Sequence, residues 1–146
     1  MILRATHLGP PQGARRHRMT VRGGHARAYQ DPRQAVEEMD LAARLRAELP
    51  EGWSTDGGYV VHVIAWFGRP ARLRRAKDRG TGELRHLGKP DVDNVAKLVL
   101  DAATRAGVWR DDALVHTLLV QRMYLALDEE GLEVGLPRIE VMIEGG

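Results

Sequence analysis

The chain has 146 residues, of which 43% are hydrophobic and 29% charged, and it has no cysteine. This length and composition predict one globular domain, residues 1–146, and exclude a disordered chain. Without cysteine there is no disulfide, no thiol nucleophile and no zinc site built on thiolates. No apolar run is long enough to span a bilayer, and the N-terminus lacks the hydrophobic core of a signal peptide, so we expect a cytoplasmic protein without a membrane partner.

The first part of the chain predicts a strand, an arm and a helix. A short strand is expected at residues 2–7, and residues 8–29, rich in Gly, Pro and Arg, are expected to form a basic arm or loop. Asp31 and Pro32 predict a helix start, because the acid can cap the helix and proline suits its first turn. The helix is expected to end before Pro50. Its apolar residues at roughly helical spacing are Ala35, Met39, Ala42, Ala43 and Leu45.

The middle of the chain predicts a strand, a loop and a second helix. Residues 59–67 are rich in β-branched and aromatic side chains and are expected to form a strand. Residues 70–90 are expected to form a long basic loop, and loops of this length in a compact domain are usually functional. From about Asp93 the chain becomes helical, and Gly107 is a suitable residue to end the helix. The residues expected on its buried face are Val92, Val95, Val99, Ala102 and Ala106.

The C-terminal part predicts two strands, at residues 115–127 and 137–144. The turn at residues 128–131 predicts that they pair as an antiparallel hairpin. The expected fold class is therefore α+β, a small mixed or antiparallel sheet with helices packed on one face.

Charge is unevenly distributed, although the formal net charge is only +2. Residues 1–36 carry seven arginines against one acid, and residues 69–89 carry eight basic residues against two acids. Two basic segments suit a polyanionic partner such as nucleic acid. The alternative is that these arginines only form solvated faces, and charge alone does not decide between the two.

Acidic residues gather around the start of the second helix. Asp91 and Asp93 stand at the helix entry, and Lys97 follows Asp93 by one helical turn. The pair Asp111 and Asp112 precedes the next strand. We expect at least one of these two carboxylates to lie close to the entry of the second helix, beside Asp91 and Asp93. Three carboxylates from two elements are the ligands that Mg²⁺ prefers, with water and a substrate phosphate completing the shell.

Each of these residues also has an ordinary structural interpretation. An aspartate at a helix start can cap it, a lysine can pair with an acid four residues away, and two aspartates can form a polar turn. Two like charges at one helix entry repel each other unless a cation neutralises them, which favours the metal site for the set as a whole. The spacing does not fit an EF-hand, since Val95 and Ala96 stand at its fifth and sixth positions. The histidines show no zinc spacing, and no Walker or Rossmann fingerprint is present.

The segment from Lys89 to Lys97, followed by Asp101 and by Ala106-Gly-Val-Trp-Arg-Asp-Asp112, resembles the RusA family of Holliday junction resolvases. The match is contiguous over about residues 88–124, while the N-terminal half matches by pattern more than by residue. A long basic insert at residues 71–88 departs from the family pattern. This departure bears on the choice of branched substrate and not on the chemistry.

The resemblance implies an Mg²⁺-dependent endodeoxyribonuclease, with Mn²⁺ as a possible substitute, that acts as a homodimer. It would resolve Holliday junctions by paired nicks through attack of a metal-activated water on the phosphodiester. Asp91, Asp93 and Asp112 would be the essential carboxylates, with Asp111 as a less certain metal ligand, and Lys97 the catalytic lysine. No role is assigned to Asp101. The cations expected at DNA are Arg15, Arg16, Arg18, Arg74, Arg75, Lys77 and Lys89. A bacterial or phage origin would suit this family.

Two alternatives remain at this point. The first is a nuclease of the same chemistry that acts on forks, flaps or plain duplex DNA. The long basic insert supports this alternative. The second is a non-catalytic nucleic-acid-binding protein whose acids cap helices and pair with arginines.

Overall fold

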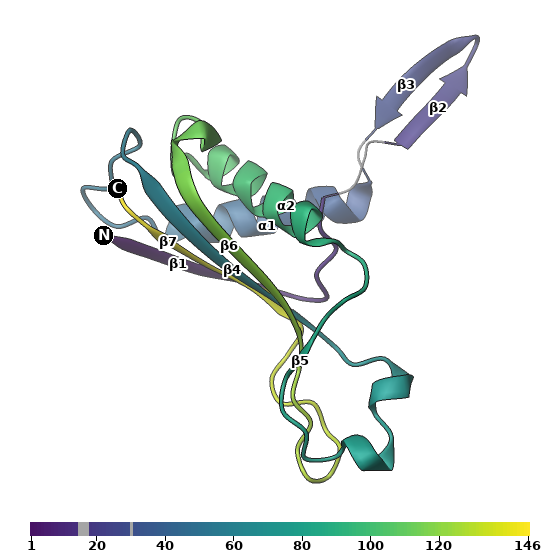
Figure 1. Ribbon diagram of the computed structural model, residues 1–146. Coiled ribbons are helices and arrows are strands. Elements are labelled where there is room, and N and C mark those ends of the chain that lie inside the picture. The colour runs from purple at the N-terminus through teal and green to yellow at the C-terminus, as the bar shows by residue number, and fades with distance from the viewer. Residues whose placement is uncertain (15–17, 30) are drawn as a thin grey trace.

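Five strands form a mixed sheet in the order β1–β7–β4–β6–β5, and β2 and β3 form a separate hairpin (Figure 1). The structure is a computed structural model that describes residues 1–14, 18–29 and 31–146. The strands of the sheet are β1 (Ile2–Leu8), β4 (Tyr59–Phe67), β5 (Leu84–Arg85), β6 (Val115–Tyr124) and β7 (Arg138–Glu144). Two helices, α1 (Pro32–Ala47) and α2 (Val92–Ala106), lie on one face of the sheet, which confirms the predicted α+β class.

The core lies between this face of the sheet and the two helices. Along β4 every second side chain, from Tyr59 to Phe67, is buried, while the alternate side chains are only half-buried. This period of two is the pattern of a strand with one covered face. In α2 the buried residues are Val95, Leu98, Val99, Ala102, Ala103 and Ala106.

The predicted hairpin between the last two strands is wrong. β4 lies between them and pairs with β6 in parallel and with β7 in antiparallel orientation. The turn signal was a local one: the Asp128 carboxylate accepts hydrogen bonds from the amides of Glu130 and Leu132, both at 2.9 Å, and Leu127 bridges to Glu133. The turn therefore closes a small loop of its own and leaves β6 and β7 free to flank β4.

Helix α1 begins as predicted but presents a different face to the core. The Asp31 carboxylate accepts a hydrogen bond from the Arg33 amide at 2.9 Å, with Pro32 as the first helical residue. Met39, one of the apolar residues noted at helical spacing, is 59% exposed. Its place is taken by acids, because Glu37 accepts hydrogen bonds from the amides of Gln12 and Gly13 and Glu38 pairs with Arg105. In α2, Val92 is likewise 44% exposed, because it precedes the first turn that packs on the sheet.

The basic arm contains a hairpin that the sequence interpretation missed. β2 (Arg18–Arg22) and β3 (His25–Tyr29) pair in antiparallel register around Gly23 and Gly24. Both glycines have positive φ, 56° and 79°, as a two-residue hairpin turn requires. The Gly-Gly pair between two five-residue runs was the available signal. The hairpin projects away from the sheet at the N-terminal end of α1 (Figure 1).

The predicted long loop forms an ordered unit beside the far end of the sheet. We call residues 68–88 and 125–137 the distal lobe; it contains two 3₁₀ turns, Ala71–Leu73 and Ala76–Asp78, and strand β5. In Figure 1 it lies below the sheet, on the opposite side from the hairpin. Within the ranges that the structure describes, no helix is both long and apolar enough to cross a membrane.

Candidate active site

The entry of α2 carries Asp91, Asp93 and Lys89. Asp91 stands at the N-cap position, yet its side chain caps no helix amide. It accepts instead a hydrogen bond from Nζ of Lys89 at 2.8 Å, and both side chains are exposed. The capping interpretation therefore does not explain Asp91. Its carboxylate is held by a surface cation, which is a weak interaction in water and leaves the oxygens accessible to another cation.

Arg122 on β6 holds the segment that leads into Asp91. Its guanidinium donates to the carbonyls of Gly88 at 2.6 Å and Pro90 at 3.0 Å, and its own carbonyl accepts from the His86 amide at 3.0 Å. The sequence interpretation treated Arg122 only as a strand residue. The signal is spatial, because β6 runs beside this segment only in the folded chain.

His86 lies under the same segment. Its ring stacks on Phe67 with a centroid distance of 3.7 Å and is 6% exposed. Burial, and secondly the nearby Arg122 guanidinium, lower the pKa of His86 below its usual value. A neutral imidazole is therefore favoured beside Arg122, where a second positive charge would be repelled.

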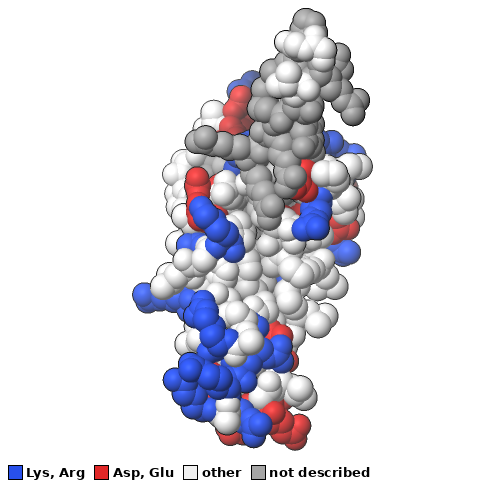
Figure 2. Space-filling view, turned by 90° about the vertical axis from the view of Figure 1, so that its right-hand side faces the viewer, with Lys and Arg blue, Asp and Glu red and all other residues white. Residues whose placement is uncertain are grey.

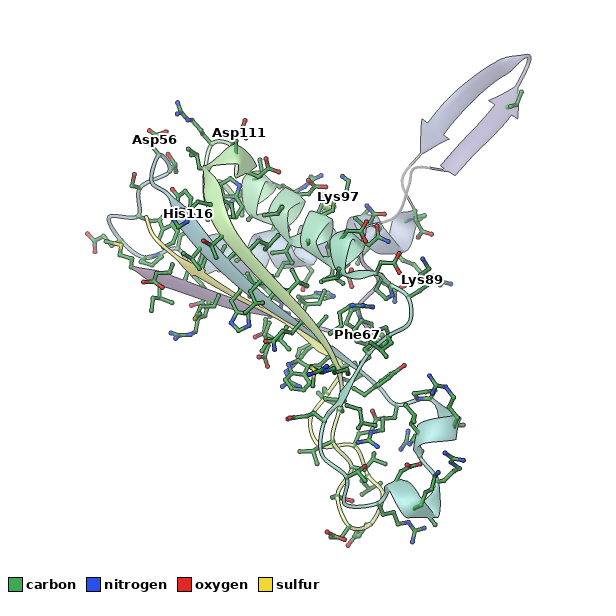
Figure 3. All side chains as sticks on the ribbon, in the orientation of Figure 1. Asp56, Phe67, Lys89, Lys97, Asp111 and His116 are labelled. Atoms are coloured by element: carbon green, nitrogen blue, oxygen red, sulfur yellow. The ribbon has the colours of Figure 1, made fainter. Side chains whose placement is uncertain are left out.

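Lys97 lies on the exposed side of α2 (Figure 3), four residues, or about one turn, after Asp93. Its ammonium pairs with the Asp101 carboxylate at 3.0 Å, four residues further along the helix. Such exposed pairs contribute about 0.3–0.5 kcal/mol, so the lysine can leave Asp101 for a phosphate at small cost.

Asp111 and Asp112 lie at the other end of α2. The 15 residues of α2 span about 22 Å, and Figure 3 shows Lys89 and Asp111 beyond opposite ends of the helix. The Asp111 carboxylate accepts a hydrogen bond from the Ala113 amide at 2.8 Å. Both acids line an open groove of about 480 Å³, together with Glu38, Asp101 and Arg105.

Within a single protomer, therefore, the predicted metal ligands do not lie close together. The prediction that Asp111 or Asp112 lies close to Asp91 in the same protomer is wrong, because the chain reverses direction only after α2 is complete. Among the residues that the structure describes, no three acidic or histidine side chains are arranged to hold a metal ion. All four groups are carboxylates, which suit a hard cation. In a single protomer, however, they lie at opposite ends of α2.

The cations expected at DNA either lie in the arm, form ion pairs with nearby acids or, within the described ranges, are exposed without an ion-pair partner. Arg15 and Arg16 lie outside the described residues, and Arg18 begins β2, with its side chain outside the description. Arg74 pairs with Glu133 at 3.1 Å and Arg75 with Asp78 at 3.7 Å. Lys77 is exposed, and Lys89 pairs with Asp91. Figure 2 shows Lys and Arg gathered over the lower end of the face onto which the entry of α2 opens.

An exposed acid–lysine set on a helix, beside a surface rich in arginine, is typical of an enzyme that acts on a polyanion. The comparisons identify its family: a family model described as Endodeoxyribonuclease RusA matches residues 9–144, nearly the whole chain. The chain belongs to this family of Holliday junction endodeoxyribonucleases, which are hydrolases acting on DNA. No curated protein matches the chain at a significant level.

Proposed function

We propose that this endodeoxyribonuclease resolves Holliday junctions by paired nicks in a reaction that needs Mg²⁺, with Mn²⁺ as a substitute. The observation that carries the proposal is the set Asp91, Asp93 and Lys97 at one exposed helix entry, in a chain matched almost from end to end by the family. We expect it to act in the cytoplasm of a bacterial or phage-infected cell.

The proposed ligands of the cation are Asp91, Asp93 and Asp112, with Asp111 as an auxiliary. When bound, a divalent cation supplies a Lewis acid for the phosphate and lowers the pKa of a bound water. Lys97 turns from Asp101 to the phosphoryl oxygens and stabilises the negative charge that develops on them. Lys89 leaves Asp91 when the cation binds and becomes a contact for the DNA backbone, as does Lys77. The proposed contacts in the arm are Arg15, Arg16 and Arg18.

The separation of the carboxylates supports a homodimer. In a two-fold dimer the same surface patch meets its own copy, so one end of α2 can face the opposite end of the partner's helix. Asp91 and Asp93 of one protomer then meet the partner subunit's Asp112, and two complete sites form together. Two symmetric sites match a junction in which two like strands must be cut.

Cleavage of a synthetic four-way junction tests the proposed function. Wild-type protein is expected to cut the junction when Mg²⁺ is added and to stop when it is chelated. Asp93→Asn and Lys97→Ala are each expected to lower the single-turnover rate by about 10²-fold or more, the usual scale for loss of one group that stabilises transition-state charge. Glu144→Gln, at an exposed acid near the end of β7 on the face of the sheet away from the helices, is the control. Wild-type rates for both site variants would contradict the assignment.

A second substrate class has specific support. The distal lobe adds a cationic surface that a four-way junction does not uniquely require, so replication forks, flaps and plain duplex belong in the same cleavage panel. Faster cleavage of a fork or a flap than of the junction would favour this alternative. The non-catalytic alternative is set aside, because the chain belongs to a family of enzymes.

A further inference from the structure

The distal lobe is organised around one buried arginine. Arg69 is 5% exposed, and no carboxylate among the described residues forms an ion pair with it. Its guanidinium instead donates to four backbone carbonyls and one hydroxyl. The acceptors are the carbonyls of Leu125 at 2.7 Å, Leu73 at 3.2 Å, Thr81 at 3.2 Å and Gly82 at 2.6 Å, and the hydroxyl of Thr81 at 2.8 Å. A buried charge needs this complete set of acceptors, so Arg69 fixes both segments of the lobe to each other.

Backbone hydrogen bonds join the two segments further. The Gly80 amide donates to the Asp128 carbonyl at 2.8 Å, and the Leu127 amide donates to the Thr81 carbonyl at 3.0 Å. The lobe thus has a folded shape before any partner binds. A partner surface that is already ordered binds without the entropy cost of folding a loop.

The cations of the lobe divide into two groups by their partners. Arg74 and Arg75 each pair with an acid of the lobe, Glu133 and Asp78, which lowers their net contribution to the local positive charge. Arg72, Lys77 and Arg79 are exposed, and among the described residues none of them has an ion-pair partner. Glu133 also accepts a hydrogen bond from the Arg69 amide at 3.1 Å. The unpaired cations are the ones left to attract an external anion.

These cations share a face with the entry of α2. The labelled Lys89, just before α2, lies toward the right-hand side in Figure 3, which is the side turned toward the viewer in Figure 2. On that face Lys and Arg gather over the lower end, where the lobe lies. An extended, rigid polyanion that reaches the entry of α2 can therefore continue along the lobe.

We propose that the distal lobe is a prefolded phosphate-binding surface for a duplex arm of the DNA substrate, with Arg72, Lys77 and Arg79 as its contacts and Arg69 as its anchor, while Arg74 and Arg75 stay paired with acids of the lobe. The inference rests on the proposed function for the identity of the polyanion. It differs from the sequence interpretation, which placed Arg74 and Arg75 at DNA, because neighbouring cations of equal charge are now given different roles.

Salt dependence of DNA binding separates the two roles. The double variants Arg72→Gln/Lys77→Gln and Arg74→Gln/Arg75→Gln each remove two positive charges from the same short segment. Binding of a labelled four-way junction and of a linear duplex is measured by fluorescence anisotropy in EDTA, across a range of KCl concentrations. Each lost phosphate contact lowers the slope of log K against log salt by about 0.9 on duplex DNA. We expect a loss of about two units for the first variant and less than half of that for the second.

The outcomes are distinct. Equal slopes for the two double variants, or no binding of either DNA by the wild-type protein, would overturn the inference. Unchanged slopes together with tight binding of an acidic polypeptide such as poly-glutamate would assign the lobe to an acidic protein and also overturn it. If the wild type cuts no junction while the slopes differ as expected, the lobe inference stands and the proposed function fails. Thermal unfolding of both variants within a few degrees of the wild type verifies that the lobe remains folded.

Discussion

At the scale of single residues, Arg122 connects the sheet to the proposed catalytic segment. It reaches from β6 to the carbonyls of Gly88 and Pro90, immediately before Asp91. The carboxylate of Asp91 is exposed, so packing does not fix its direction, and the position of its backbone matters all the more. Arg122 is in this sense a positioning residue, because it acts through the segment and not on the substrate.

Replacing Arg122 tests this role. Loss of a charged hydrogen bond of this kind is worth about 1.5–3 kcal/mol, or roughly 10- to 100-fold in rate if it is lost at the transition state. Arg122→Met is expected to lower the single-turnover cleavage rate by that factor while DNA affinity changes less than about threefold. Arg122→Lys, which keeps one donor, is expected to recover part of the rate. A variant that loses affinity and rate in equal measure would indicate a direct DNA contact.

At the scale of elements, the distal lobe depends on Arg69 for its fold. We expect Arg69→Met to increase amide hydrogen exchange in residues 70–88 and 125–134, since five hydrogen bonds are lost together. Arg74→Met is the matched control, because it removes an arginine from the same lobe but only an exposed ion pair. Exchange in α2 serves as an internal reference. Equal protection in the two variants would show that Arg69 is not the anchor.

Elements with a local signal could be predicted from the sequence, and their pairing could not. The cap at Asp31, the strand at residues 59–67 and the end of α2 at Gly107 each follow from neighbouring residues. The position of β4 between β6 and β7 follows from packing between residues far apart in the chain. The buried face of α1 was also missed, because Glu37 and Glu38 are buried only through partners that lie far away in sequence. An acidic residue in a helix is normally expected to be exposed to solvent.

At the scale of the whole molecule, the candidate site is divided between two ends of one helix. Sequence spacing could identify Asp91, Asp93, Asp111 and Asp112 as a set of carboxylates. It could not give the distance between the two pairs, because spacing along the chain does not show where the chain reverses.

Mixing two inactive variants tests the proposed dimer. In Asp93→Asn and Asp112→Asn homodimers both sites are incomplete. A mixed dimer whose sites combine residues of both protomers has one site with both changes and one intact site, so nicking returns, to about a quarter of the wild-type site concentration at random exchange. Sites built within one protomer would regain nothing. Absence of recovered nicking, with subunit exchange confirmed by differently tagged protomers, would contradict the shared site.

The distal lobe occupies a particular place in the connectivity. β4 and β6 are parallel neighbours, so the chain must travel back along the sheet between them, and α2 makes that return. Residues 68–88 are inserted into this connection between β4 and β6, before α2 begins. Doubling the length of such a segment costs only about 0.6 kcal/mol in closure entropy. Evolution can therefore lengthen, shorten or recharge the lobe while strand order and the helix entry stay the same, so the choice of DNA shape can change independently of the cutting chemistry.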